Sequence, residues 1–221
     1  MPAMAELWDD MALLIERGGY VMIPLLALSV VALALIIERA WFWTNCHRHR
    51  TTKRLARLND ALRRGDVGES RKLTKGDRTP YGLVARRLID RGATEAIALE
   101  AVETVRPLID RFMVTLSTII TAAPLLGILG TVIGIIQSFR ILGDQAGLTD
   151  PADVAAGIST ALLTTALGLI VALVTLFPYM IFRGHANRAI GRLESLIAAA
   201  QQGAGTLAGG SDVRSRKTAS D

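Results

Sequence analysis

The sequence has a single cysteine in 221 residues and no charged side chain in three long stretches. Because Cys46 stands alone, an intrachain disulfide and a cysteine-based metal cluster are excluded. The uncharged stretches cover residues 18–37, 112–139 and 154–182. A core helix of a soluble domain rarely stays uncharged for much more than about 14 residues, whereas about 20 apolar residues cross the hydrocarbon core of a bilayer. The sequence therefore predicts three membrane-spanning helices.

The motifs of common enzyme and nucleotide sites are also missing. The glycines of GILGTVIG (residues 127–134) do not form G-x-G-x-x-G, and no G-x-x-x-x-G-K-[ST] occurs. His47 and His49 lie beside Cys46 and offer at most a loose metal site, but an incidental cluster in a basic flank is the simpler interpretation. We predict that the protein is not an enzyme and that it holds neither a cofactor nor a metal.

The charges are distributed by segment. Residues 40–111 hold sixteen Lys and Arg against nine Asp and Glu, whereas the N-terminal tail and residues 140–153 are mainly acidic. By the positive-inside rule, the N-terminus and the 140–153 loop face outward, and the basic segment and the C-terminus face the cytoplasm. The basic segment is interpreted as a solvated cytoplasmic face and not as a nucleic-acid surface.

These signals divide the chain into seven segments. Residues 1–17 form either a short amphipathic helix at the outer membrane–water interface or a frayed tail, and their acidic start is not that of a cleavable signal peptide. The others are span one (18–39), a helical cytoplasmic segment (40–111), span two (112–139), an outward-facing loop (140–153), span three (154–182) and a cytoplasmic tail (183–221).

Glycine and proline indicate where the cytoplasmic helices end. We expect breaks near Gly65, Gly68, Gly76 and Pro80, and a new helix after the N-cap residue Thr94. That helix is expected to continue into span two without a convincing break, with Pro107 as the one interruption, and the tail is expected to be disordered from residue 203 on. The uncharged runs of spans two and three, at about 1.5 Å per residue, are longer than a bilayer core and should protrude into the cytoplasm.

Small and hydroxyl-bearing residues follow one face of spans two and three. The glycines of this face are expected to pack the two helices together, since small residues let helix backbones approach in lipid; they are Gly127, Gly130, Gly134, Gly157 and Gly168. Threonines lie among them, such as Thr131 on span two and Thr164 on span three, and most membrane threonines only bond a carbonyl of their own helix. The hydrocarbon part of each span lacks Asp, Glu, Lys, Arg and His. If protons cross here, a partner must supply the group that binds them.

The motifs of all three spans resemble those of the ExbB/TolQ/MotA proton-channel family, in particular its ExbB/TolQ branch. The matching stretches are GGYVMIPLLALSVVALALIIER (residues 18–39), APLLGILGTVIGIIQSF (residues 123–139) and GISTALLTTALGLIVAL (residues 157–173).

The resemblance implies a subunit of the bacterial inner membrane that forms a homo-pentameric ring, with spans two and three around a pore. An ExbD/TolR-like single-span partner would bring a membrane aspartate into that pore, and a TonB/TolA-like protein would receive the mechanical work. By position in the motifs, Thr131 and Thr165 would line the proton pathway, together with Thr160. The surrounding lipid would be the other partner.

The sequence departs from the family pattern at two positions. Where the family often has glutamate it has Thr160, and where a proline is usual it has Val174. The first departure leaves room for a membrane scaffold that packs in the same way but does not conduct. A self-contained secondary transporter is a weaker alternative, because three spans without a broken-helix pair or an ion ligand give it no binding site.

Overall fold

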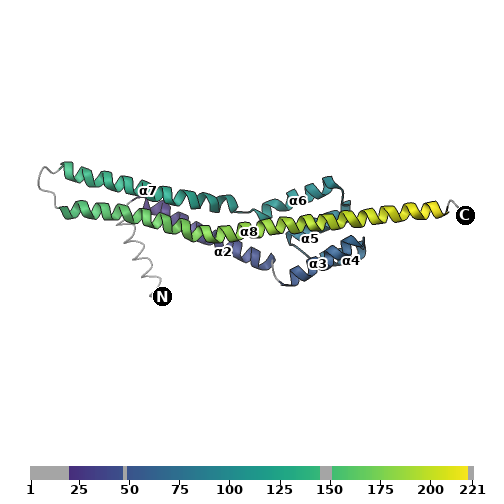
Figure 1. The fold of residues 1–221 in the computed structure, drawn as a ribbon. Helices are drawn as coiled ribbons and strands as arrows, with labels where there is room; N and C mark the ends of the chain where they lie inside the picture. Colours follow the sequence, from purple (N-terminus) through teal and green to yellow (C-terminus); the bar gives the residue numbers. More distant parts are fainter. Residues whose placement is uncertain (1–19, 47–48, 145–150, 219–221) are drawn as a thin grey trace. The chain divides into compact units, whose positions relative to one another are not determined.

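The structure, a computed structural model, describes residues 20–46, 49–144 and 151–218. Residues 1–17, for which an interfacial helix is predicted, lie outside these ranges. The described residues form helices and short connections: α2 (Met22–Cys46), α3 (His49–Arg63), α4 (Val67–Thr74), α5 (Pro80–Arg91), α6 (Glu95–Ile109), α7 (Met113–Asp144) and α8 (Pro151–Thr218) (Figure 1). The prediction of a helical protein is confirmed in these ranges.

Three of these helices contain segments long and apolar enough to cross a membrane. The segments are Met22–Cys46, Met113–Arg140 and Val154–Gly205. Only 22%, 22% and 28% of their most apolar windows are buried within the chain, so most of their apolar surface is left for lipid or for other subunits. The three predicted membrane helices are therefore present by length and composition.

The chain divides into two compact units. The span unit comprises the described residues of Met1–Arg39 and Phe112–Ile181, and the helical unit comprises those of Ala40–Arg111 and Phe182–Asp221. Helix α8 contributes residues to both.

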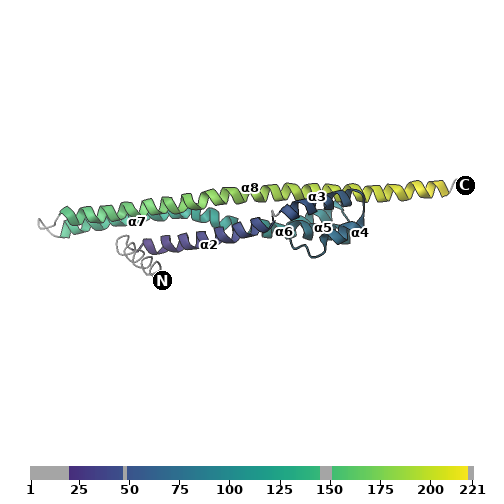
Figure 2. The ribbon, with the colours of Figure 1, turned by 90° about the horizontal axis from the view of Figure 1, so that it is seen from below.

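Within the span unit, α7 and the first part of α8 lie side by side and antiparallel (Figures 1 and 2). Their direction follows from the contacts, because Gly168 lies against Ala123 while Gly157 lies against Ser138. A small apolar cluster joins both helices to α2; its buried members are Met22, Leu25 and Ala123, and partly buried leucines and a valine surround them.

The helical unit is built from short helices with well-formed ends. Asp66 caps α4 by accepting a hydrogen bond from the Glu69 N–H at 2.8 Å. Gly65 and Gly92 adopt φ angles of 68° and 92°, which favour glycine, and they end α3 and α5. The expected break at Gly68 does not occur, because the Asp66 cap starts α4 before that glycine.

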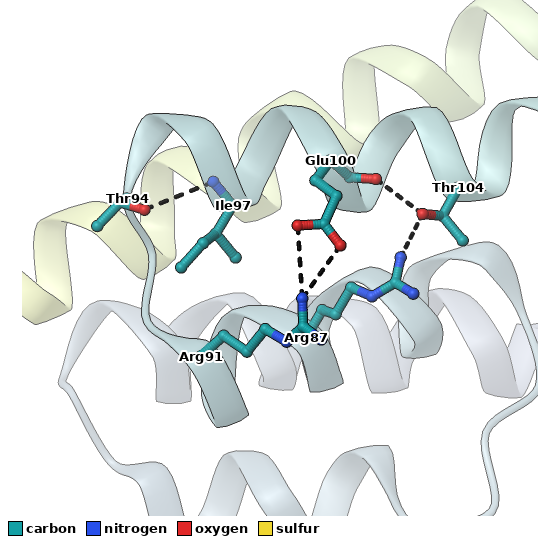
Figure 3. Close-up of polar contacts among 6 residues, drawn as sticks. All are labelled: Arg87, Arg91, Thr94, Ile97, Glu100 and Thr104. Atoms are coloured by element: carbon teal, nitrogen blue, oxygen red, sulfur yellow. Dashed lines mark hydrogen bonds and ion pairs between the residues drawn. The ribbon is translucent and has the colours of Figure 1, made fainter.

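Polar contacts hold α5 against α6 in the same unit (Figure 3). Arg91 forms an ion pair with Glu100 at 3.1 Å, and Arg87 donates a hydrogen bond to the Thr104 hydroxyl. At the start of α6, the Thr94 hydroxyl accepts from the Ile97 N–H at 3.5 Å, as the sequence predicts for an N-cap. The same two helices bury Leu88 of α5 and Ala101 and Val105 of α6.

The prediction that one helix runs from Thr94 into span two is wrong. Helix α6 ends at Ile109, and α7 begins at Met113. Phe112, between them, has a φ of 62°, which a helix cannot accommodate and which costs a non-glycine residue about 1–3 kcal/mol. Its ring lies 5.7 Å from the guanidinium carbon of the buried Arg39, and this cation–π contact helps to hold the strained residue in place.

Two helices extend past the segments expected from sequence. Helix α2 continues beyond residue 39 to Cys46, and it includes Trp41 and Trp43. Helix α8 continues to Thr218, although disorder is predicted from residue 203. Alanine and glutamine at residues 198–202 are strong helix formers and carry the helix into that region.

Candidate functional site in the α7–α8 seam

The contact between α7 and α8, here called the seam, depends on glycine at several positions along the two helices. A Cβ placed at Gly127 would lie 2.9 Å from the Thr164 carbonyl oxygen, and one at Gly134 would lie 2.6 Å from the Ala161 Cβ. Such distances are shorter than side-chain packing allows. Larger residues would therefore force the two helices apart.

The other glycines of the predicted packing face also lie in the seam. A Cβ at Gly130 would lie 2.8 Å from the Thr164 Cβ, and one at Gly168 would lie 2.5 Å from the Ala123 carbonyl oxygen. Gly157 lies against the Ser138 hydroxyl, which itself donates to the Gly134 carbonyl at 3.0 Å. All five glycines thus border on the neighbouring helix.

Close backbone approach exposes helix carbonyls to hydroxyl groups from the other helix. The Thr131 hydroxyl of α7 and the Thr165 hydroxyl of α8 are in hydrogen-bonding contact with each other. Thr165 also reaches across to the Gly127 carbonyl at 2.9 Å, and Thr131 reaches across to the Ala161 carbonyl at 3.3 Å. Both threonines are half-buried, so they lie at an edge of the seam and not at its centre.

A third threonine occupies the centre of the seam. Thr164 is only 1% exposed, and its hydroxyl lies 3.1 Å from the Gly127 carbonyl and 2.7 Å from the Ala161 carbonyl. The sequence places Thr164 on the small-residue face but does not mark it as functional. Only the pairing of the two helices shows that it shares its acceptors with Thr131 and Thr165.

Thr160 stands apart from this network. It is half-buried on α8, and its hydroxyl takes part in none of the hydrogen bonds among the described residues. The structure therefore brings Thr131 and Thr165 together but does not join Thr160 to them.

The chemistry available in the seam is that of neutral hydroxyls and carbonyls. Residues 113–139 and 154–182 contain no Asp, Glu, Lys, Arg or His, so these segments carry no side chain that titrates near neutral pH. Hydroxyl groups donate and accept hydrogen bonds, and they can solvate a proton carrier without the fixed counter-charge that would trap it.

The weak metal candidate receives no support from the described part of the chain. His47 lies outside the described residues, and no cluster of three metal-binding side chains forms within them. His185 stacks on Trp43 with ring centroids 5.4 Å apart, and its Nδ1 lies 3.1 Å from Arg188.

Comparison with known proteins decides the family. Residues 71–195, more than half of the chain, match the MotA/TolQ/ExbB proton channel family. The chain belongs to this family of non-enzymatic membrane proteins. The matched range includes α7 and the seam residues of α8.

Individual relatives extend this family assignment. An ExbB-like biopolymer transport protein of Synechocystis is 40% identical over 177 residues, which cover 75% of this chain and 81% of the relative. An ExbB homologue of Methanothermobacter thermautotrophicus is 30% identical over 184 residues, covering 81% and 65%. The Tol-Pal system protein TolQ of Pseudomonas aeruginosa is 42% identical over 79 residues, covering 35% and 33%.

Proposed function

We propose that this chain is the ring-forming subunit of a proton-driven energy transducer in a bacterial cytoplasmic membrane. Five copies would surround a pore lined by α7 and α8, and protons entering the pore would drive movement of an ExbD/TolR-like partner. The partner would transmit work to a TonB/TolA-like protein, which is consistent with the biopolymer transport named for the relatives. The N-terminus and residues 140–153 would face the periplasm, as the charge distribution predicts.

The contact between the Thr131 and Thr165 hydroxyls carries this proposal. Both residues occupy the motif positions to which the family resemblance assigns the proton pathway. In the structure their hydroxyls are in contact at a half-buried edge of the seam. Because residues 113–139 and 154–182 offer hydroxyls but no Asp, Glu, Lys, Arg or His, they suit a pathway in which the acid comes from the partner. Thr160, which is not held by the hydrogen-bond network, would face the same pathway at a second level.

The exposed surface leaves both helices available for contact with neighbouring subunits. Large apolar residues remain at least one-third exposed along both helices, among them Leu125, Ile128, Val132 and Phe139 on α7 and Leu162, Leu169, Leu173 and Phe177 on α8. Two exposed helices need neighbours in lipid, either acyl chains or further protein.

The decisive experiment is proton flux in liposomes that contain the chain with its co-purified single-span partner. Thr131→Val and Thr165→Val keep the shape of each side chain but remove the hydroxyl, so both should abolish flux while the complex still assembles. Thr118→Val is the matched control, since Thr118 is exposed on α7 and its hydroxyl only bonds the Val114 carbonyl of its own helix.

Two results would reject the proposal in different ways. Full flux in both Thr131→Val and Thr165→Val would remove these residues from the pathway. A correctly assembled wild-type complex without any flux would support the alternative of a non-conducting scaffold, which the threonine at position 160 already favours.

A further inference from the structure

Three hydroxyl groups in the seam compete for two backbone carbonyls. Thr131, Thr164 and Thr165 place their hydroxyls 3.1, 3.1 and 2.9 Å from the Gly127 oxygen. The Thr164 hydroxyl also lies 2.7 Å from the Ala161 carbonyl oxygen, and the Thr131 hydroxyl lies 3.3 Å from it.

Each of these carbonyls has room for one hydroxyl hydrogen. A carbonyl oxygen has two lone pairs, and in an α-helix one of them takes the N–H of the residue four positions ahead. For Gly127 that residue is Thr131, and for Ala161 it is Thr165. Three hydroxyl hydrogens therefore share two free acceptor positions, and one hydrogen must go elsewhere.

Burial decides which hydroxyl keeps its carbonyl. Thr164 is 1% exposed, so its hydroxyl has no alternative outside the seam, and a buried hydroxyl without an acceptor is costly. Thr131 and Thr165 are half-buried and in contact with each other. The surplus hydrogen thus belongs to this pair: it lies between the two oxygens or points out of the seam.

We propose that Thr164 is a positioning residue for the proton pathway: by occupying one of the two carbonyls, it keeps one hydroxyl hydrogen of the Thr131–Thr165 pair directed toward the pathway. Without the Thr164 hydroxyl, Thr131 and Thr165 would each find a carbonyl inside the seam, and the pathway would lose its donor. This inference rests on the proposed role of Thr131 and Thr165.

The test compares three variants in the same flux assay with the co-purified partner. Thr164→Val keeps the side-chain shape and removes the hydroxyl, and Thr164→Ser keeps the hydroxyl and removes a methyl group. Thr175→Val is the matched control, because Thr175 is also 1% exposed on α8 but its hydroxyl bonds only the Val171 carbonyl of its own helix at 2.7 Å.

We expect Thr164→Val to lower flux by about three- to tenfold, the effect of one hydrogen bond on a rate. Thr164→Ser and Thr175→Val should stay within about twofold of wild type on the same scale. A packing role for Thr164 predicts the opposite order, with the smaller serine more harmful than the isosteric valine. That order, wild-type flux in Thr164→Val, or failure of Thr164→Val alone to assemble would overturn the proposal.

The same assay separates this inference from the proposed function. If Thr131→Val and Thr165→Val conduct normally, the pathway itself is misassigned. If they block flux while Thr164→Val does not change it, only the role of Thr164 is rejected.

Discussion

Gly168 of α8 lies directly against the backbone of Ala123 in α7, where an added Cβ would be 2.5 Å from the carbonyl oxygen. The obstacle is backbone and cannot rotate away, as a side chain could. The two helices can therefore lie this close together at residue 168 only because that residue has no side chain.

Gly168→Ala is expected to lower the thermal stability of the chain, by about 1–3 kcal/mol for the forced separation of packed helices. Unfolding of the purified protein in detergent, followed by circular dichroism, measures the change. Gly191→Ala is the matched control on the same helix, because a Cβ there meets nothing within 4 Å, and it should leave stability unchanged or raise it. Equal behaviour of the two variants would show that the close contact is absent.

Thr160→Val is expected to preserve both assembly and thermal stability. Its hydroxyl enters none of the hydrogen bonds among the described residues, so no bond is lost on substitution. If Thr160 faces the pathway at a second level, flux falls less than in Thr131→Val or Thr165→Val. A loss of assembly would instead assign Thr160 to an interface.

Asp66→Ala is expected to destabilise the helical unit by about 1 kcal/mol, because the Glu69 N–H at the start of α4 loses its acceptor. Asp66→Asn keeps a side-chain oxygen in the same place and serves as the control. Thermal unfolding of the full chain gives the comparison. An alanine variant as stable as the asparagine variant would mean that the cap contributes nothing.

Glu100→Gln is expected to change stability by less than about 1 kcal/mol. The ion pair with Arg91 is solvent-exposed, with 59% and 53% of the two side chains accessible, so water screens it. Unfolding measured at low and high salt checks this. A loss well above 2 kcal/mol, outside the range for exposed pairs, would indicate that another subunit buries this site.

Tyr81 provides a pH-dependent prediction. Burial raises the pKa of its phenol above the ordinary value; the nearby Cys46 acts in the same direction, and Arg192 opposes both. The folded chain therefore holds this proton more tightly than the unfolded chain. The resulting stabilisation is present below about pH 10 and is lost as the pH rises through the raised pKa.

Tyr81→Phe should consequently lose less stability than wild type between about pH 9 and pH 11. Both proteins are unfolded by denaturant across this range, so that the titration of groups that do not interact with Tyr81 cancels in the difference. Parallel pH profiles would show that Tyr81 titrates alike in the folded and unfolded chain.

Local sequence signals determined the helices and some of their ends. Long runs without charge indicate membrane helices because a bilayer core excludes charge over a fixed length. Capping at Thr94 also follows from side-chain chemistry within one turn. The break at Phe112 could not be found this way, since its left-handed backbone conformation is accompanied by a contact with Arg39, 73 positions earlier in the chain.

The sequence by itself determined that residues 113–139 and 154–182 carry glycine and hydroxyl residues on one face and lack Asp, Glu, Lys, Arg and His, because spacing and composition are properties of one chain segment. Only the tertiary structure decided which carbonyl each hydroxyl meets, because that depends on the register between two helices. The sharing of Gly127 and Ala161 by three threonines is a product of that register.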